Sequence, residues 1–325
     1  MKVAVTGAAG FVGTNLVNQL VDQGNEVIAI DRTRSVNVRQ DGVTWVDGDV
    51  LDRASMEKAL AGAEVVYHLV AMITLAQKDE LAWTVNTKGV RTVAEAALAV
   101  GVRKMVHCSS VHSFDQENCN GILSETSARS VDPARPVYDR SKWQGEIELR
   151  EVIDSGLDAV ICNPTGVYGP ADYGLSRVNG LLRTAARGRM PVFVGGGFDF
   201  VDDRDVAAGL MAAAEKGQTG ENYLLSGHML ELTKAMRIAA GAAGRRGPLF
   251  GIPLWLLETV IPILEPIGTK LGSDVLSKSA MSAILAAPEI DGSKARAELG
   301  YAPRPAEETI RDLIAFLVSS GQLGS

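Results

Sequence analysis

Two patterns of apolar residues alternate in the first half of the chain. Short runs rich in Val and Ile recur, and several are almost continuously apolar, as expected for parallel strands that helices cover on both faces. Between these runs, apolar residues recur every three or four positions, the period of an amphipathic helix. The alternation predicts an α/β fold built from β-α-β units around a doubly wound parallel sheet.

The patterns locate individual elements. They predict strands at residues 2–6, 26–30, 43–49, 64–70, 104–110 and 158–164. They predict helices at residues 11–24, 80–101 and 137–156. Each of these helices ends at a glycine, the residue that most often closes a helix.

The regular alternation of strand and helix patterns weakens after residue 165, where turns rich in Gly and Pro separate shorter elements. We therefore place the sheet domain at residues 1–165 and a smaller, substrate-binding lobe mainly at residues 166–325. Residues 200–217 predict a turn and a helix that pack back on the sheet domain. The chain is thus expected to return to that domain near residues 191–225, so the C-terminal lobe is interleaved with it.

Charge and cysteine content narrow the class of protein. The net charge is -7 and the isoelectric point is near 5.3, which argues against nucleic acid as the partner, because phosphate backbones bind clustered Lys and Arg. Three scattered cysteines, Cys108, Cys119 and Cys162, predict neither a disulfide framework nor a metal site. They are typical of a reducing cytoplasm.

Neither the N-terminal residues nor the most apolar later stretch predicts a secretory signal or a membrane span. "MKVAVTG" runs straight into a predicted strand without the features of a secretory signal. The most apolar later stretch, residues 248–268, is interrupted by Pro253, Pro262 and Pro266 and by Glu258 and Glu265 before it reaches a spanning length. We expect no integral membrane segment and a cytoplasmic protein.

The glycine-rich turn "VTGAAGFVG" lies between the first strand and the first helix. Gly7, Gly10 and Gly13 allow a sharp bend and a close approach of phosphate to the backbone, and the helix N-terminus favours a pyrophosphate. Their GxxGxxG spacing differs from the general GxGxxG dinucleotide pattern, and a simple tight bend is the alternative. The position of the turn favours a dinucleotide site in a Rossmann fold.

Acidic residues at the next strand ends suggest the dinucleotide. Asp31 follows the turn at the distance where a carboxylate accepts hydrogen bonds from the adenosine ribose, which favours NAD. Arg32 and Arg34 stand close enough to bind a 2′-phosphate, so NADP stays open. Asp49 and Val50 are candidates for contacts with the adenine, with a solvated turn as the alternative.

Three residues predict acid–base chemistry. Tyr138 and Lys142 in "YDRSK" share a helical face at i and i+4, where the ammonium would lower the pKa of the phenol. Hydride transfer to a carbonyl needs such a proton donor. Ser110, at the end of the strand that closes with "CSS", can hydrogen-bond a substrate oxygen. No metal is needed.

These motifs occur in an order that resembles a known family. "TGAAGFVG", "GDV", "HLVA", "CSS", "YDRSK", "NPTGVYGP" and "VDDRDVA" are similar to those of the extended short-chain dehydrogenase/reductases, the NAD-dependent epimerase/dehydratase group. The resemblance implies that Tyr138 is the catalytic acid/base, that Lys142 binds the nicotinamide ribose and lowers the tyrosine pKa, and that Ser110 polarises the substrate oxygen. It also implies a homodimer paired through the helices near residues 80–100 and 137–155.

The resemblance extends to further residues. It implies that Phe11 and Val12 lie along the pyrophosphate, that Leu69 and Ala71 flank the cofactor, and that Pro164 and Val167 lie near the nicotinamide. It gives Asn86 a structural or water-holding role. His112, two residues after Ser110, faces the substrate or, as the plainer expectation, packs in the core.

Residues next to the motifs help to choose among the reactions that this family catalyses. Val111 and His112 follow Ser110, where dehydratases of the family typically carry Asp and Glu, so the acid and base for water elimination are missing and the sequence argues against dehydration. Phe198 and Asp199 stand where nucleotide-sugar enzymes tend to place an arginine for the diphosphate. Asn163 occupies a position that reaches the diphosphate in sugar epimerases, which keeps epimerisation open.

Apolar residues in the second half favour a hydrophobic substrate pocket, although most are also consistent with the core. These candidates are Leu254, Trp255, Leu256, Leu257, Met281, Ile284 and Leu285. The sequence therefore predicts an NAD(P)-dependent oxidoreductase that resembles dihydroflavonol reductases and hydroxysteroid dehydrogenases and acts on a carbonyl or alcohol of a small, hydrophobic molecule. The alternative is a sugar-nucleotide epimerase with the same Ser, Tyr and Lys and a tightly held NAD.

Overall fold

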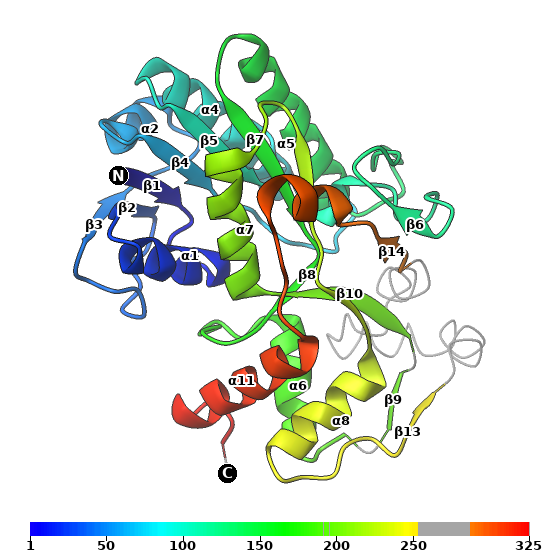
Figure 1. Cartoon of the computed structure of the whole chain (residues 1–325). Coiled ribbons are helices and arrows are strands. Elements are labelled where there is room, and N and C mark those ends of the chain that lie inside the picture. The colour runs from blue at the N-terminus through cyan, green and yellow to red at the C-terminus, as the bar shows by residue number, and fades with distance from the viewer. Residues whose placement is uncertain (191, 195, 253–286, 325) are drawn as a thin grey trace.

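A seven-stranded parallel sheet forms the centre of the molecule (Figure 1). The computed structural model describes residues 1–190, 192–194, 196–252 and 287–324. Within these ranges the strand order is β11-β7-β5-β4-β1-β2-β3. The strands are β1 (Lys2–Thr6), β2 (Glu26–Asp31), β3 (Val43–Asp47), β4 (Val65–His68), β5 (Lys104–Cys108), β7 (Ala159–Pro164) and β11 (Asn222–Leu225).

This strand order confirms the doubly wound α/β fold. The chain winds outward from β1 in one direction through β2 and β3, and in the other through β4, β5, β7 and β11. The direction reverses between β1 and β4. In open parallel sheets a crevice forms at this point, beyond the carboxyl ends of the strands, and ligands bind there.

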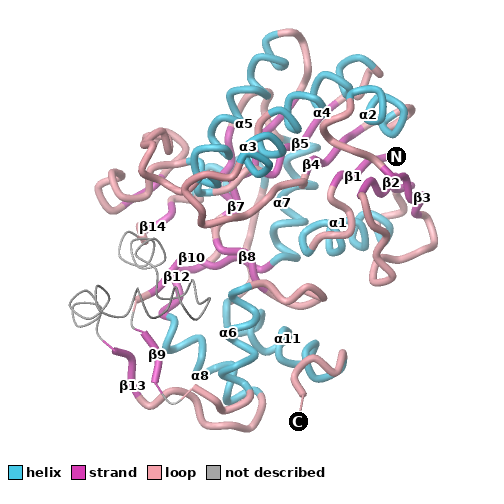
Figure 2. Tube along the Cα trace, turned by 180° about the vertical axis from the view of Figure 1, so that it is seen from behind, coloured by secondary structure: helices cyan, strands magenta, loops and turns pink. Residues whose placement is uncertain are grey.

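Helices cover both faces of the sheet, as the continuous apolar strands predicted. Figure 1 shows α1 and α7 on the near face, and Figure 2, from behind, shows α2, α3, α4 and α5 on the other. Each face has its own core: Val5, Leu16 and Leu210 belong to one, and Met56 and Leu149 to the other. The helix bounds are α1 (Phe11–Asp22), α2 (Arg53–Leu60), α3 (Glu80–Asn86), α4 (Lys88–Ala99), α5 (Val137–Asp154) and α7 (Asp203–Lys216).

The helix predicted at residues 80–101 is two helices. Thr87, with φ -115° and ψ -75°, separates α3 from α4, and its hydroxyl donates to the carbonyl of Trp83 (2.8 Å). The preceding Asn86 donates to the carbonyl of Met72 (3.0 Å) and accepts from the Met72 N–H (2.8 Å). The break therefore accompanies a tertiary contact of Asn86 with a segment 14 residues earlier in the chain, which the helical spacing does not reveal.

The C-terminal lobe lies below the sheet in Figure 1. Its core includes Tyr168, Leu182, Met236 and Ile314. The elements are β8 (Gly166–Tyr168), β10 (Gly197–Asp202) and β12 (His228–Glu231) in one sheet, the pair β9 (Val192–Val194) and β13 (Phe250–Ile252), and helices α6 (Arg177–Ala186), α8 (Leu232–Ala242) and α11 (Ala306–Ser319). Shorter elements are η1 (Val111–Ser113), the pair β6 (Ile122–Leu123) and β14 (Glu289–Ile290), and the π-helical turn η3 (Ala295–Leu299).

The chain crosses between the two parts several times. It leaves the large sheet after β7, builds β8, α6, β9 and β10, and returns with α7 and β11. The seven candidates for an apolar pocket, from Leu254 to Leu285, lie outside the described residues. None of the helices in the described ranges combines the length and the apolarity needed to cross a membrane.

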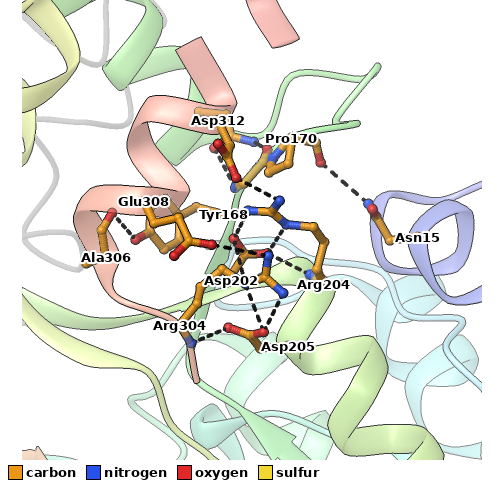
Figure 3. Close-up of polar contacts among 12 residues, drawn as sticks. Asn15, Tyr168, Pro170, Asp202, Arg204, Asp205, Arg304, Ala306, Glu308 and Asp312 are labelled. Atoms are coloured by element: carbon orange, nitrogen blue, oxygen red, sulfur yellow. Dashed lines mark hydrogen bonds and ion pairs between the residues drawn. The ribbon is translucent and has the colours of Figure 1, made fainter. Parts of the chain in front are cut away.

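Two arginines join α7 to the C-terminal lobe (Figure 3). Arg204 donates to the buried carboxylate of Asp202 (2.6 Å) and to Asp312 on α11 (2.8 Å). Arg304 donates to Asp205 on α7 (2.8 Å), and its Nε lies 3.6 Å from Asp202. Because these charges are partly buried and shared, they fix the orientation of the lobe over the carboxyl ends of the strands.

Candidate active site

The glycine turn after β1 has a geometry that other residues do not tolerate. Gly7 has a φ of +75°, and its N–H donates to the carbonyl of Ile30 at the end of β2 (2.9 Å). A Cβ on Gly13 would lie 2.1 Å from the carbonyl oxygen of Gly7, and one on Gly10 3.2 Å from it. The glycines therefore let α1 begin directly against the turn.

The N-terminus of α1 suits an anion. Gly10 is its N-cap, no side chain caps the first turn, and that turn holds no acidic residue. Uncapped N–H groups and the positive end of the helix dipole favour phosphate. These features fit the pyrophosphate of a dinucleotide.

Asp31 lies beside the turn. Its carboxylate accepts hydrogen bonds from the backbone N–H of Ala9 (3.0 Å) and of Thr33 (3.2 Å). Arg32 is exposed, and the Nε of Arg34 lies 3.9 Å from an oxygen of Asp47. An acceptor for ribose hydroxyls and a cation for a 2′-phosphate thus stand next to each other.

A cavity of about 320 Å³ opens over the turn. One wall is the turn with the start of α1, and the opposite wall is the loop at residues 171–176 of the C-terminal lobe. Its lining residues are Ala9, Gly10, Phe11, Thr14, Ser35, Asn37, Ala171, Asp172, Tyr173, Gly174 and Ser176. Phe11 thus lines the cavity, while Val12 packs partly against the core, and a contact of either residue with a pyrophosphate stays a prediction.

The segment after β4 passes next to the glycine turn. A Cβ on Gly7 would lie 3.2 Å from the backbone nitrogen of Val70, and both Leu69 and Ala71 keep part of their surface exposed. Pro164 is buried at the end of β7, and Val167 is partly buried on β8. Leu69, Ala71 and Pro164 therefore lie at the carboxyl edge of the large sheet, and Val167 lies just beyond β7 on the small sheet of the lobe.

The two candidates for adenine contacts lie in different surroundings. Asp49 is exposed, and its carboxylate accepts from the N–H of Leu51 (2.9 Å). This geometry is that of a solvated turn, the alternative to an adenine contact. Val50 is only 8% exposed and packs in the core, where Gly89 of α4 leaves room for it. A contact of either residue with adenine stays a prediction.

The three candidate catalytic residues meet at the end of β5. Ser110 is buried directly after that strand, and Tyr138 and Lys142 face it from the start of α5. The hydroxyl of Ser110 accepts from the N–H of His112 (3.2 Å) and lies near enough to the phenol of Tyr138 to lower its pKa. Lys142 donates to the carbonyl of Cys108 (3.0 Å).

The lowering of the tyrosine pKa by Lys142 stays a prediction, because burial dominates the pKa of Tyr138 in the protein alone. Burial raises the pKa of Tyr138 above its usual value, and the hydrogen bond with Ser110 opposes this without cancelling it. Burial also lowers the pKa of the Lys142 ammonium, against the charges of Cys108 and Glu146. In the protein alone, the net shift of the tyrosine is therefore upward, because desolvation of the phenolate outweighs the favourable interactions.

A buried carboxylate that the sequence analysis missed lies behind this group. Glu146 is fully buried on α5 and accepts from Ser109 (2.6 Å), Asn163 (2.7 Å), Asn222 (3.0 Å) and Arg129 (3.2 Å). Its position four residues after Lys142 places it on the same helical face, and this spacing is the signal that could have found it.

Asn163 belongs to this network, which corrects its predicted role. Its amide nitrogen donates to the carbonyl of Ser110 and the hydroxyl of Ser113 (3.1 Å each), and its oxygen accepts from Asn222 (2.8 Å). The side chain is fully buried. All its hydrogen-bonding groups are engaged inside the protein, so it does not reach a substrate diphosphate.

Asn86 and Asp199 also have internal partners. Asn86 donates to Ser141 on α5 (2.9 Å) and thereby ties the segment at Met72 to the helix that carries Tyr138. The resemblance implied either a structural or a water-holding role for Asn86, and these contacts are structural. Asp199 accepts from Thr165 (2.6 Å) and from the N–H of Gly227 (2.7 Å) and does not carry the positive charge that a diphosphate needs.

Comparisons with known proteins agree with this geometry. Residues 3–226 match the sequence profile described as the NAD dependent epimerase/dehydratase family. Sterol demethylase protein B from Methylococcus capsulatus is 31% identical over 99% of this chain and 100% of its own length. A protein from Synechocystis sp. with the provisional name dihydroflavonol 4-reductase is 30% identical over 98% of this chain and 94% of its own length.

A solved structure is similar throughout. The crystal structure of gox2253 superposes with a TM-score of 0.85 at 30% identity and covers 98% of both chains. The likeness therefore includes the C-terminal lobe as well as the sheet domain.

Proposed function

This chain belongs to the NAD-dependent epimerase/dehydratase family of extended short-chain dehydrogenase/reductases, and from that premise we propose that it is a reductase or dehydrogenase of a hydrophobic carbonyl or alcohol. Tyr138 is the acid/base that gives a proton to, or takes one from, the substrate oxygen. The observation that carries the proposal is that Ser110 at the carboxyl end of β5 and Tyr138 at the start of α5 lie next to each other, with Lys142 on the next turn of α5.

The roles of the three residues follow from their partners. The backbone N–H of His112 holds the hydroxyl of Ser110 beside the phenol of Tyr138, so a substrate oxygen between the two hydroxyls would accept a hydrogen bond from each. The upward shift of the Tyr138 pKa keeps the phenol protonated and ready to donate during reduction. Lys142 would hold the nicotinamide ribose and favour the phenolate once the substrate and the dinucleotide exclude water.

Residues of the sheet edge would hold the dinucleotide. Gly7, Gly10 and Gly13 with the start of α1 would bind the pyrophosphate, and Asp31 would bind the adenosine ribose, which supports NAD. When bound, the dinucleotide would supply or accept the hydride. The exposed Arg32 keeps NADP as the alternative to be tested.

The competing epimerase function loses its main support. Asn163 was the residue that favoured a sugar nucleotide, and its side chain is enclosed in the network around Glu146. Asp199 adds a carboxylate rather than a cation near that region. The names of the two curated relatives, which refer to a sterol and to a dihydroflavonol, support an apolar ring compound instead.

Release of bound cofactor separates the two functions. The purified protein is denatured, and the supernatant is assayed for NAD(H) and NADP(H). A dehydrogenase exchanges its cofactor in every turnover, so we expect little bound dinucleotide, reversible binding of added NAD and oxidation or reduction across a panel of apolar ketones and alcohols. Stoichiometric NAD in the supernatant, with thermal stabilisation by a UDP-sugar and not by apolar ketones, would favour epimerisation.

We also propose a homodimer that pairs through α4 and α5. Arg91 on α4 is bonded to Glu148 and Glu151 on α5, so the two helices present one continuous surface. Light scattering at micromolar concentration tests the proposal, and a mass of one chain contradicts it.

A further inference from the structure

A histidine and a carboxylate lie beside the proposed catalytic tyrosine. His112 belongs to η1, the turn that begins directly after Ser110, and Asp139 follows Tyr138 on α5. The Nδ1 of His112 lies 3.2 Å from an oxygen of Asp139. The imidazole and phenol rings meet edge to face, with centroids 5.6 Å apart and planes at 62°. The histidine thus contacts Ser110 through its backbone and Tyr138 through its ring.

Asp139 determines which nitrogen of the imidazole is free. A carboxylate beside Nδ1 favours the tautomer that carries its proton on that nitrogen, so Nε2 is the atom that gains and loses a proton. The side chain of Asp139 is only 15% exposed, whereas that of His112 is 39% exposed. The imidazole is therefore held on one side and accessible on the other. The plainer expectation of a histidine packed in the core is wrong.

The charged groups around His112 in the described ranges are Asp139 and Arg135. Burial lowers the pKa of the imidazole, and Arg135 lowers it further, but the hydrogen bond and the charge of Asp139 outweigh both and raise the pKa above its ordinary value. His68 and His107 differ, because burial lowers the pKa of each. His112 is therefore the histidine of this region that can exchange protons near neutral pH.

We propose that His112, oriented by Asp139, is a second acid/base group of the active site and acts on the carbon next to the carbonyl carbon that Tyr138 serves. This inference rests on the proposed function. It names the substrate class more closely, as a ketone or secondary alcohol with a proton on the neighbouring carbon, and the enzyme can exchange that proton.

The chemistry balances without a further reactant. Nε2 of neutral His112 takes the proton from the α-carbon, and the electron pair of the broken C–H bond forms the C=C bond of an enol or enolate. Ser110 and Tyr138 stabilise the oxygen, which gains negative charge. The protonated imidazole then returns a proton to the same carbon. The net result is exchange of the α-proton with solvent, with the proton removed and returned on the same face.

The first test measures the pKa of His112 directly and needs no substrate. The chain has four histidines, so ring-proton NMR resolves them, and His112→Gln assigns the signal. Asp139→Asn should lower the pKa of His112 by about one unit or more. His228→Gln, which changes an exposed histidine on β12, is the matched control and should leave that pKa in place. An unchanged pKa in Asp139→Asn overturns the pairing.

The second test measures exchange without hydride transfer. A ketone that the enzyme reduces is incubated with the protein and oxidised cofactor in D₂O, and loss of the α-proton signal is followed by NMR. His112→Gln should slow exchange by about 10²-fold or more while it slows reduction of the same ketone far less. The exchange rate of the unmodified enzyme should rise with pH through the pKa that NMR gives for His112, and Asp139→Asn should move both together.

Two outcomes overturn the proposal. Equal losses of exchange and reduction in His112→Gln would show that His112 only positions Tyr138, and unchanged exchange would show that it takes no part. A protein that reduces no ketone of the panel contradicts the proposed function instead, and the pKa of His112 in Asp139→Asn then decides the pairing by itself.

Discussion

Asn163 on β7 donates a 2.7 Å hydrogen bond to Glu146 on α5, and neither side chain is exposed. The same amide nitrogen donates to the carbonyl of Ser110, so the carboxylate and Ser110 are connected through one side chain. These hydrogen bonds explain why Asn163, which the sequence placed near a substrate diphosphate, instead holds parts of the fold together. It also means that the geometry of Ser110 depends on a buried charge.

Loss of this buried charge should destabilise the fold. Glu146→Ala leaves Arg129 and two amides without their acceptor, and breaking a buried ion pair costs about 3–5 kcal/mol. Glu146→Gln keeps the shape and one acceptor oxygen, so its loss of unfolding free energy should be smaller. Urea unfolding of both variants measures the difference, and equal stability of Glu146→Ala and the unmodified protein would show that the network contributes nothing.

Removal of the phenol should abolish turnover and spare cofactor binding. Tyr138→Phe keeps the ring against His112 and removes the proton donor, a change typically worth 10²–10⁴-fold in rate. We expect kcat to fall by about this factor, with the Kd for the dinucleotide, measured by fluorescence quenching, within about twofold. Retained turnover in Tyr138→Phe would assign the proton transfer to another group.

The residue next to the glycine turn should set the choice of dinucleotide. Asp31→Ala removes a ribose acceptor and a carboxylate that repels a 2′-phosphate, so the ratio of NADP to NAD affinity should rise by about tenfold or more. Arg32→Ala is the matched variant and should lower NADP affinity alone. Titration calorimetry with both dinucleotides measures the ratio. A stronger loss of NAD binding in Arg32→Ala than in Asp31→Ala would reverse the assignment.

The sequence predicted most of the sheet domain because its strands are continuous apolar runs between amphipathic helices. It failed at Asn86 and Thr87, where one predicted helix is split and Asn86 bonds Met72, a contact that only the fold makes. Motif order also located Ser110, Tyr138 and Lys142. It did not predict that the amide of Asn163 is enclosed, because that depends on Glu146 and Asn222, which only the fold brings next to it.

The close approach of α1 to the glycine turn should make Gly13 intolerant of any side chain. In Gly13→Ala the new Cβ would lie 2.1 Å from the carbonyl oxygen of Gly7, and overpacking of this kind costs about 1–3 kcal/mol. Gly241→Ala in α8 is the control, because no atom lies within 4 Å of its new Cβ and alanine favours helix. Thermal unfolding should show a lower Tm for Gly13→Ala and an equal or higher Tm for Gly241→Ala. A similar response of both variants would contradict the tight packing of the turn.

The buried Asp203 should make the protein less stable as pH rises. Burial raises the pKa of this carboxyl well above 3.8, and the nearby charges of Asp202 and Asp172 add to the shift. A group with a raised folded-state pKa contributes its stability fully below the unfolded-state pKa, and that contribution is lost as pH rises through the folded-state pKa. Asp203→Asn removes the ionisation and keeps the shape, so its advantage in unfolding free energy should be small near pH 4 and grow toward neutral pH. Asp154→Asn, at an exposed site on α5, controls for the change in net charge. Denaturant unfolding of the three proteins without cofactor from pH 4 to pH 8 measures the trend, and parallel pH curves for Asp203→Asn and the unmodified protein would show that Asp203 is not held in its neutral form.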